Sequence, residues 1–400
     1  MTGIEFPILY KAAFSHPAID NHAHPLLRTD SRSVKPFEGV FSEAEGEELL
    51  EGTPHTLACY RGTKQLAELY RMEKQETVIW EQIKAYRDTM DYLELCRLCF
   101  TAGKIRCVLM DDGLGGSLGI GEEYKWHDQF TVGKTKRVVR IEVVAEAILT
   151  EVLGKAGTPD GRQLLEHFER QLKTKLREYG ADSEVVGFKS IVCYRTGLEV
   201  GLESRLDDKR VALKQLWYAY HDTGKIRLEH KSLNDEVVRM ALDVAAHCGK
   251  PVQFHTGLGD NDLTLTQSAP ALLQPIIKAY HETVIVLLHA SYPYMREAGY
   301  LTSVYRNVYL DFGEVFPMVS RSGQKDIIQQ LLELTPTNKI MWSSDGRWWP
   351  ESYYLAIQQA REILYEVLSE SILRKEVNEG EATEIISKVL YNNAARLYGV

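Results

Sequence analysis

The 400-residue sequence has few cysteines, and they are not clustered. Six cysteines are spread irregularly along the chain, which favours reduced thiols and a cytoplasmic protein over a disulfide-bonded secreted one. Cys96 and Cys99 form a CxxC pair inside a helical pattern, and no second pair completes a zinc cage. We therefore expect both thiols to be core residues.

Long apolar runs and an excess of positive charge are lacking as well. No apolar segment is long enough to span a bilayer, and the first residues show no basic-then-apolar secretory pattern. The formal net charge of -9 implies no basic face that would neutralise phosphates. We expect a protein that binds neither nucleic acid nor membranes; the sequence leaves homo-oligomerisation open.

What the sequence does contain is a series of eight short, almost wholly apolar segments. Apolar strands that alternate with helical patterns indicate a parallel sheet covered on its outer face. Eight of them predict an α/β protein with a (β/α)8 TIM barrel, formed by residues 1–400 as one domain. Residues 26–103 show helical rather than strand patterns and are expected to form a helical insertion, or cap, after the first strand. The first strand begins with the apolar run 17–19, and the others are expected at 105–110, 137–141, 185–191, 251–255, 284–289, 307–311 and 339–345.

Histidines and an aspartate lie at the carboxyl ends of four of these strands. His22 and His24 stand one residue apart, and such side chains leave the same face of an extended chain. His255 follows the fifth strand, His289 the sixth and Asp345 the eighth. Imidazole and carboxylate are ligands for zinc and similar ions, and a barrel brings its strand ends around one mouth. We therefore expect a divalent metal centre of one or two ions, with zinc as the expected metal.

Lys189 lies inside the fourth predicted strand, where an unpaired ammonium is costly. Three interpretations are nearly equal. The amine could react with carbon dioxide to give a carbamate that bridges two metals, which is slightly favoured and would make Lys189 a metal ligand. It could instead stay cationic and bind a substrate carboxylate, or it could form a salt bridge to Glu142 or Asp345.

At this point the ordered set of residues resembles a known family. An HxH after the first strand, histidines after the fifth and sixth, and an aspartate after the eighth are similar to the amidohydrolase superfamily of metal-dependent hydrolases. Four further segments resemble the amidohydrolase half of the fungal FluG and plant nodulin–glutamine synthetase fusion proteins; they lie at 111–114, 187–198, 289–293 and 393–398. The 400 residues contain no counterpart of the glutamine-synthetase half, so the resemblance does not imply ATP-dependent ligation.

The resemblance implies a metal-dependent hydrolase of a C–N bond in a small-molecule amide. Asp345 would ligate the metal, take the proton from the attacking water and pass it to the leaving nitrogen. His289 would bind a second metal or hydrogen-bond the developing oxyanion. Two alternatives stay open: a metal-dependent decarboxylase of the same superfamily, and a catalytically inactive barrel that serves as a scaffold.

Two arginines suggest the charge of the substrate. Arg195 lies in the loop that leaves the fourth strand, and Arg347 lies two residues beyond Asp345. A guanidinium group matches a carboxylate in bidentate fashion, so we expect both arginines to bind a substrate carboxylate close to the scissile bond. The alternative is that one or both pair with Glu142, Glu199 or Glu351.

A competing motif has to be weighed against the metal centre. The segment 115–119, Gly-Gly-Ser-Leu-Gly, matches the GxSxG nucleophile elbow. An elbow serine must sit at a sharp turn between a strand and a helix. Ser117 lies well past the strand that ends at Met110, and no good helix start follows it. A chance match is the better explanation.

Overall fold

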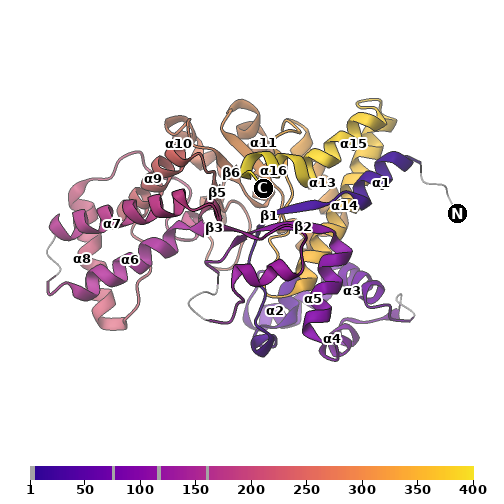
Figure 1. The fold of residues 1–400 in the computed structure, drawn as a ribbon, viewed down its shortest axis with the longest axis horizontal. Helices are drawn as coiled ribbons and strands as arrows, with labels where there is room; N and C mark the ends of the chain where they lie inside the picture. The colour runs from indigo at the N-terminus through magenta and orange to yellow at the C-terminus, as the bar shows by residue number, and fades with distance from the viewer. Residues whose placement is uncertain (1–4, 74–76, 115–118, 159–161) are drawn as a thin grey trace. The chain divides into compact units, whose positions relative to one another are not determined.

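A computed structural model describes residues 5–73, 77–114, 119–158 and 162–400 (Figure 1). Eight strands form one sheet in sequence order, and each strand pair with a defined register is parallel. Helices separate the strands, so the predicted (β/α)8 fold is confirmed. The strands are β1 (Ala18–Ala23), β2 (Ile105–Asp111), β3 (Lys136–Arg140), β4 (Val185–Ser190), β5 (Val252–Phe254), β6 (Ile285–Leu287), β7 (Val308–Asp311) and β8 (Ile340–Met341).

The α-helices have lengths that range from one turn to more than six turns. They are α1 (Pro7–Ser15), α2 (Gly46–Gly52), α3 (Leu57–Leu69), α4 (Trp80–Asp88), α5 (Tyr92–Gly103), α6 (Ile141–Lys155), α7 (Arg162–Ala181), α8 (Leu206–Thr223), α9 (Lys231–Cys248), α10 (Gln274–Ala279), α11 (Met295–Val304), α12 (Val315–Met318), α13 (Arg321–Leu332), α14 (Pro350–Leu373), α15 (Glu379–Ser387) and α16 (Asn393–Tyr398). Short 3₁₀ turns lie between several of them, and a π turn, Lys388–Asn392, joins the last two.

The described chain divides into two compact units. Unit 1 comprises residues 1–136, 259–261 and 310–400, and unit 2 comprises residues 137–258 and 262–309. Unit 1 therefore contains β1, β2 and β8, and unit 2 contains β4 to β6 and nearly all of β3; the boundary divides β7, whose last two residues belong to unit 1. The prediction of a single domain stays a prediction.

The first and last strands are neighbours within unit 1. Strand β8 is shorter than the predicted 339–345, but the backbone beyond it continues to hydrogen-bond to β1. The Asp345 amide donates to the His22 carbonyl at 3.0 Å, and the His24 amide donates to the Gly346 carbonyl at 2.7 Å. Positive φ angles of 49° at Asp345 and 58° at Trp348 interrupt regular strand geometry. The segment after β8 therefore stays beside β1, although β8 itself ends at Met341.

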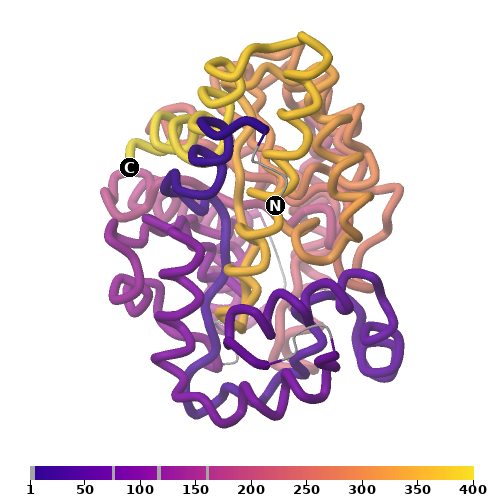
Figure 2. The backbone as a smooth tube through the Cα atoms, turned by 90° about the vertical axis from the view of Figure 1, so that its right-hand side faces the viewer, coloured from indigo at the N-terminus to yellow at the C-terminus, as the bar shows by residue number. Residues whose placement is uncertain are grey.

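Between β1 and β2, unit 1 carries helices α2 to α5, drawn in indigo to purple in Figure 2. Their buried side chains contribute to an aromatic core. Phe37 stacks on Trp80 with ring centroids 4.9 Å apart, and Trp348 and Trp349 from the segment after β8 belong to the same cluster. Side-chain caps fix the starts of two helices: Thr56 accepts from the Cys59 amide before α3, and Asp91 accepts from the Glu94 amide before α5. The insertion is thus packed against the segment that follows Asp345.

Unit 2 covers strands β4 to β6 with amphipathic helices. Helix α7 buries five residues at helical spacing, Leu165, Phe168, Leu172, Leu176 and Gly180, and it packs on α6 and α9. Strands β4, β5 and β6 pair in register, with Phe188 opposite Val252 and Val252 opposite Ile285. Their carboxyl ends therefore lie level with one another.

The structure bears on two features of the sequence, the lack of long apolar runs and the scattered cysteines. Among the described residues, no helix combines the length and the apolar character that crossing a membrane requires. All six cysteines are free thiols. Cys96 and Cys99 are fully buried in α5, as expected for core residues.

Candidate metal centre

The best-defined ligand group lies in unit 1, where β1 and the segment after β8 meet. His22 and His24 are buried, and their rings leave the same face of the strand end with centroids 4.9 Å apart. One carboxylate oxygen, Oδ1 of Asp345, lies 3.2 Å from His22 Nε2 and 3.4 Å from His24 Nε2. The structure thus brings together three of the six residues predicted to bind metal.

Backbone hydrogen bonds and a side-chain contact orient His24. Its Nδ1 lies 3.0 Å from the backbone carbonyl of Asp111, at the end of β2. A carbonyl accepts only, so Nδ1 carries the proton and Nε2 keeps its lone pair on the side of Asp345. The Asp111 carboxylate lies 3.9 Å from the same Nδ1, and Asp111 with His22 and His24 forms a further buried group of metal-ligating atoms.

Behind this group lies a buried carboxyl that connects β1 to β8. Asp20 accepts from the Ser344 amide at 2.8 Å and also bonds to the Ser344 hydroxyl. Burial raises the pKa of Asp20 to about 8, although the hydrogen bonds from Ser344 act in the opposite direction. Asp311 at the end of β7 accepts from the Asn21 amide group at 2.8 Å. These polar contacts hold the strand ends that present His22 and Asp345.

Two acidic residues near Asp345 were not found from the sequence. Glu43, in the insertion, and Glu314, three residues beyond β7, each offer an oxygen, and these two oxygens and one from Asp345 all lie within 4.8 Å of one another. Burial raises the pKa of the Glu314 carboxyl well above its usual range, and the charges of Glu43 and Asp345 add to this shift. Glu314 follows a predicted strand, which is the signal that could have found it; Glu43 lies in a helical insertion, where the sequence gives no such signal.

A second histidine group lies in unit 2. His255 directly follows β5, and His289 lies two residues beyond β6, with ring centroids 4.4 Å apart. The Nε2 of His255 lies 2.8 Å from the Leu258 carbonyl and 2.9 Å from the Tyr194 hydroxyl. The contact with a carbonyl indicates a proton on Nε2, which leaves Nδ1 as the nitrogen available to accept a hydrogen bond or bind a metal. His255 and His289 therefore form a pair inside unit 2.

Lys189 lies in β4 of the same unit, and only 1% of its surface is exposed. It stands opposite Gln253 in β5 and opposite Arg140 in β3. Burial raises the pKa of the Cys193 thiol, while the positive charge of Lys189 acts to lower it. The burial is compatible with each of the three interpretations, so the carbamate stays a prediction.

Both predicted substrate-binding arginines have carboxylate partners in the structure, but different ones from those predicted. Arg347 forms an ion pair with Glu43, while Glu351 pairs with Arg87. The Arg195 guanidinium lies 3.6 Å from the Glu146 carboxylate. Burial raises the pKa of the Glu142 carboxyl, and the positive charge of Arg195 acts in the opposite direction as a smaller effect. Substrate binding by these arginines remains a prediction.

Most of the GxSxG motif at 115–119 lies outside the described residues. Ser117 and its neighbours at 115, 116 and 118 lie outside the described residues, and only Gly119 of the five is described. In the described residues that precede the motif, strand β2 ends at Asp111.

An amidohydrolase family model matches residues 166–400, which is more than half of the chain. The chain belongs to the amidohydrolase family. A curated relative of this amidohydrolase, the protein FluG of Emericella nidulans, is 40% identical over 96% of the chain. The chain spans about half the length of that relative, since it covers 46% of FluG. The predicted resemblance is confirmed.

Solved structures that resemble this amidohydrolase share its fold. A candidate metal-dependent hydrolase from Lactobacillus casei ATCC 334 superimposes with a TM-score of 0.81 at 22% identity, covering 98% of this chain and 97% of that one. A uronate isomerase from Bacillus halodurans C-125 superimposes with a TM-score of 0.66 at 13% identity, covering 98% and 96%. At these identities the likeness shows the fold alone.

Proposed function

We propose that this protein is a metal-dependent hydrolase that cleaves the C–N bond of a small amide bearing a carboxylate. The observation that carries the proposal is the single carboxylate oxygen of Asp345 placed between the Nε2 atoms of His22 and His24. Ligands bound at ~2.0–2.1 Å around a tetrahedral zinc ion lie about 3.3 Å apart. The measured separations of 3.2 and 3.4 Å fit that spacing.

The chain's own residues would act in the following way. His22, His24 and Asp345 would hold a divalent ion, for which zinc is the proposed metal, and the other proposed ligands are His255, His289 and Lys189. When bound, such an ion lowers the pKa of a water toward ~7 and polarises a carbonyl group.

Proton transfer falls to Asp345. Its carboxylate would take a proton from the attacking water and deliver it to the leaving nitrogen. His289 would hydrogen-bond the oxygen on which negative charge develops, or complete a second metal site. Arg195 and Arg347 would bind the substrate carboxylate by charge-assisted hydrogen bonds, in addition to their contacts with Glu146 and Glu43.

The experiment is elemental analysis of the purified protein together with an assay for amine release from a panel of small amides. In the double variant His22→Ala/His24→Ala, metal content and turnover should fall together, because two ligands are removed. His255→Ala should also lower metal content if unit 2 contributes ligands. His281→Ala is the matched control, because that side chain is exposed, and it should keep both properties. Turnover that survives in a metal-free double variant would contradict the proposal, and release of carbon dioxide without amine would point to decarboxylation.

A further inference from the structure

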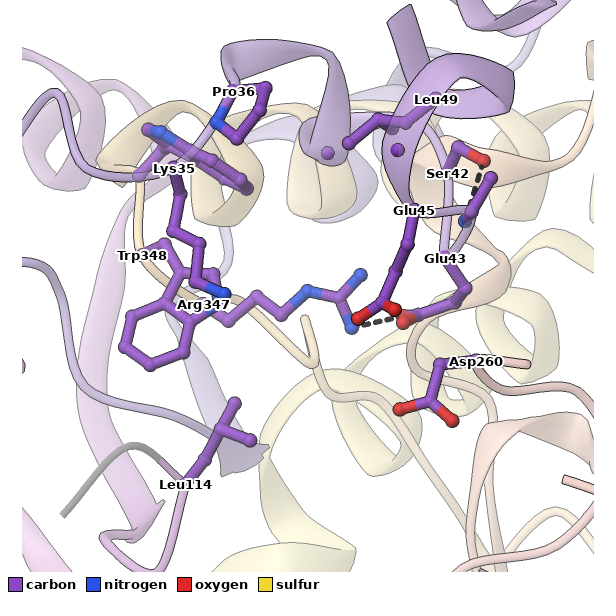
Figure 3. A pocket seen from close by; sticks show the side chains of 14 residues that line it. Lys35, Pro36, Ser42, Glu43, Glu45, Leu49, Leu114, Asp260, Arg347 and Trp348 are labelled. Carbon is purple, nitrogen blue, oxygen red and sulfur yellow. Dashed lines mark hydrogen bonds and ion pairs between the residues drawn. The ribbon is translucent and has the colours of Figure 1, made fainter. Parts of the chain in front are cut away.

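Unit 1 contains a cavity of about 440 Å³ lined by residues of the helical insertion, by the segment after Asp345 and by Asp260 (Figure 3). Its lining is strongly charged. Three carboxylates line it, on Glu43, Glu45 and Asp260, together with the two cations of Lys35 and Arg347. None of these residues except Arg347 was singled out from the sequence.

The charges of the cavity are separated in space. Figure 3 shows Glu43, Glu45 and Asp260 on one side, and Lys35 with Trp348 on the other. The Lys35 ammonium lies 6.0 Å from the centroid of the Trp348 ring. Arg347 extends across the cavity and forms its ion pair with Glu43. One wall is therefore acidic, and the opposite wall is basic and aromatic.

The cavity adjoins the proposed metal centre. Glu43 lines the cavity, and its carboxylate belongs to the same 4.8 Å cluster as that of Asp345. Asp345 in turn contacts both His22 and His24. A molecule in the cavity can therefore place a bond beside Asp345 while its other groups contact the charged walls.

The charges that line the cavity restrict which charged groups a bound molecule can carry. A guanidinium group has five N–H donors in a planar fork, so Arg347 can bond to Glu43 and still donate to a second carboxylate, assisted by Lys35. A ligand with a carboxylate alone would bring negative charge toward Glu45 and Asp260, and like charges placed together across an interface are unfavourable. A positive group on the ligand removes that repulsion and complements the acidic wall.

We propose that the cavity binds a zwitterionic amide, with its ammonium group against Glu45 and Asp260 and its carboxylate against Arg347 and Lys35. This inference rests on the proposed function for the identity of the scissile bond. It adds a requirement that the proposed function lacks, namely a protonated amine on the substrate. Small amino-acid amides are the matching chemical class.

The test measures binding rather than turnover, with the 400-residue protein depleted of metal so that the amide probes are not hydrolysed, and with three probes. The probes are L-glutamine, N-acetyl-L-glutamine, which lacks the ammonium, and L-glutamine methyl ester, which lacks the carboxylate. Calorimetry should give L-glutamine a Kd at least about tenfold lower than that of either derivative, because each derivative loses one charge-assisted contact. This comparison needs no variant and so does not depend on a variant's folding.

Variants then assign the preference to the acidic wall. The double variant Glu45→Gln/Asp260→Asn keeps side-chain size and removes two charges, and it should bind L-glutamine and N-acetyl-L-glutamine with similar Kd. Glu47→Gln is the matched control, since Glu47 is an exposed residue of α2 outside the cavity lining, and it should retain the tenfold preference.

Three results would overturn the inference: equal wild-type affinity for L-glutamine and its N-acetyl derivative, no binding of L-glutamine, or a preference that survives the double variant. A different result would refute the proposed function. A protein that shows the charge preference but releases no amine from any amide in its metal-loaded form would refute the hydrolase and leave the zwitterion site in place.

Discussion

Three residues in the segments that follow β6, β7 and β8 have a positive φ angle. His289 has a φ of 65°, Glu314 of 63° and Asp345 of 49°, in a region that residues other than glycine seldom adopt. Each lies just beyond its strand, at the end of β6, β7 and β8 respectively. Such conformations cost of the order of 1–3 kcal/mol and concentrate at functional sites. At the scale of single residues, the segments that follow β6, β7 and β8 are thus held in conformations of higher energy where His289, Glu314 and Asp345 lie.

Lys189 provides a prediction at the residue scale. If its amine is carbamylated, Lys189→Ala should lose metal, and added short carboxylic acids should partly restore it, because they replace the missing carboxylate oxygens. Lys155→Ala is the control, since that lysine is exposed and pairs with Glu151 in its own helix, and this variant should keep its metal. Elemental analysis with and without added acid measures the effect. Full metal content in Lys189→Arg would rule the carbamate out and leave the substrate or ion-pair interpretation.

His127 provides a second residue-scale prediction, on pH dependence. Burial lowers its pKa to about 4. Its Nε2 accepts from the Leu26 amide at 3.1 Å, and its Nδ1 lies 3.2 Å from the Glu123 and Tyr124 carbonyls. The folded protein therefore holds the ring neutral, while the unfolded chain binds a proton below pH ~6.5. This residue should lower the free energy of unfolding as pH falls from about 6.5 to about 4, by at most ~1.4 kcal/mol per pH unit.

Urea unfolding at about pH 7 and pH 5 checks the prediction. His127→Gln, which cannot titrate, should lose less stability between the two pH values than the wild type. His281→Gln should behave like the wild type, because that side chain is exposed. An unchanged pH dependence in His127→Gln would show that another group controls acid sensitivity.

At the scale of elements, a buried polar network joins the helical insertion to α14. Glu351 in the first turn of α14 accepts from Arg87 Nε at 2.5 Å and from the Tyr70 hydroxyl at 2.8 Å. The Arg87 guanidinium also lies 4.4 Å from the centroid of the Phe37 ring. Helix α14 begins five residues after Asp345, at Pro350. The network therefore fixes the insertion to the segment that carries Asp345 and Arg347.

Breaking this network should be costly. Arg87→Met removes one partner and leaves a buried carboxylate, which typically costs about 3–5 kcal/mol. Arg97→Met is the matched control, because Arg97 pairs with Glu94 on the exposed surface of α5, and such pairs contribute less than about 1 kcal/mol. The free energies of unfolding from urea titrations give both values. Equal costs in the two variants would show that the buried pair does not hold the insertion in place.

At the scale of the whole molecule, the chain places its chemistry at strand ends in both units. Unit 1 holds His22, His24 and Asp345, while unit 2 holds His255 and His289. In a (β/α)8 protein the carboxyl ends of the strands are where active sites form. Side chains that are more than 300 residues apart in sequence, such as His24 and Asp345, can therefore contact each other once β1 and β8 are neighbours.

The sequence by itself determined the eight strands, their order and the residues at their ends. This succeeds because apolar strand segments and helical periodicity are local properties. His22 and His24 could be placed on one face of the first strand because side chains two residues apart in a strand point to the same side. The predicted metal-ligand set followed from the polar residues at these strand ends, and the family resemblance agreed with it. Of that set, Asp345 meets His22 and His24 in the structure.

Only the tertiary structure decided which charges meet. Glu43 lies in a helical insertion with no pattern that marks it, yet it pairs with Arg347 and lies beside Glu314 and Asp345. The sequence offered Glu142, Glu199 and Glu351 as arginine partners because they were acidic and near predicted loops, whereas Glu351 is taken by Arg87. Contacts between segments far apart in the chain depend on how helices pack on strand ends, and local periodicity carries no information about that packing.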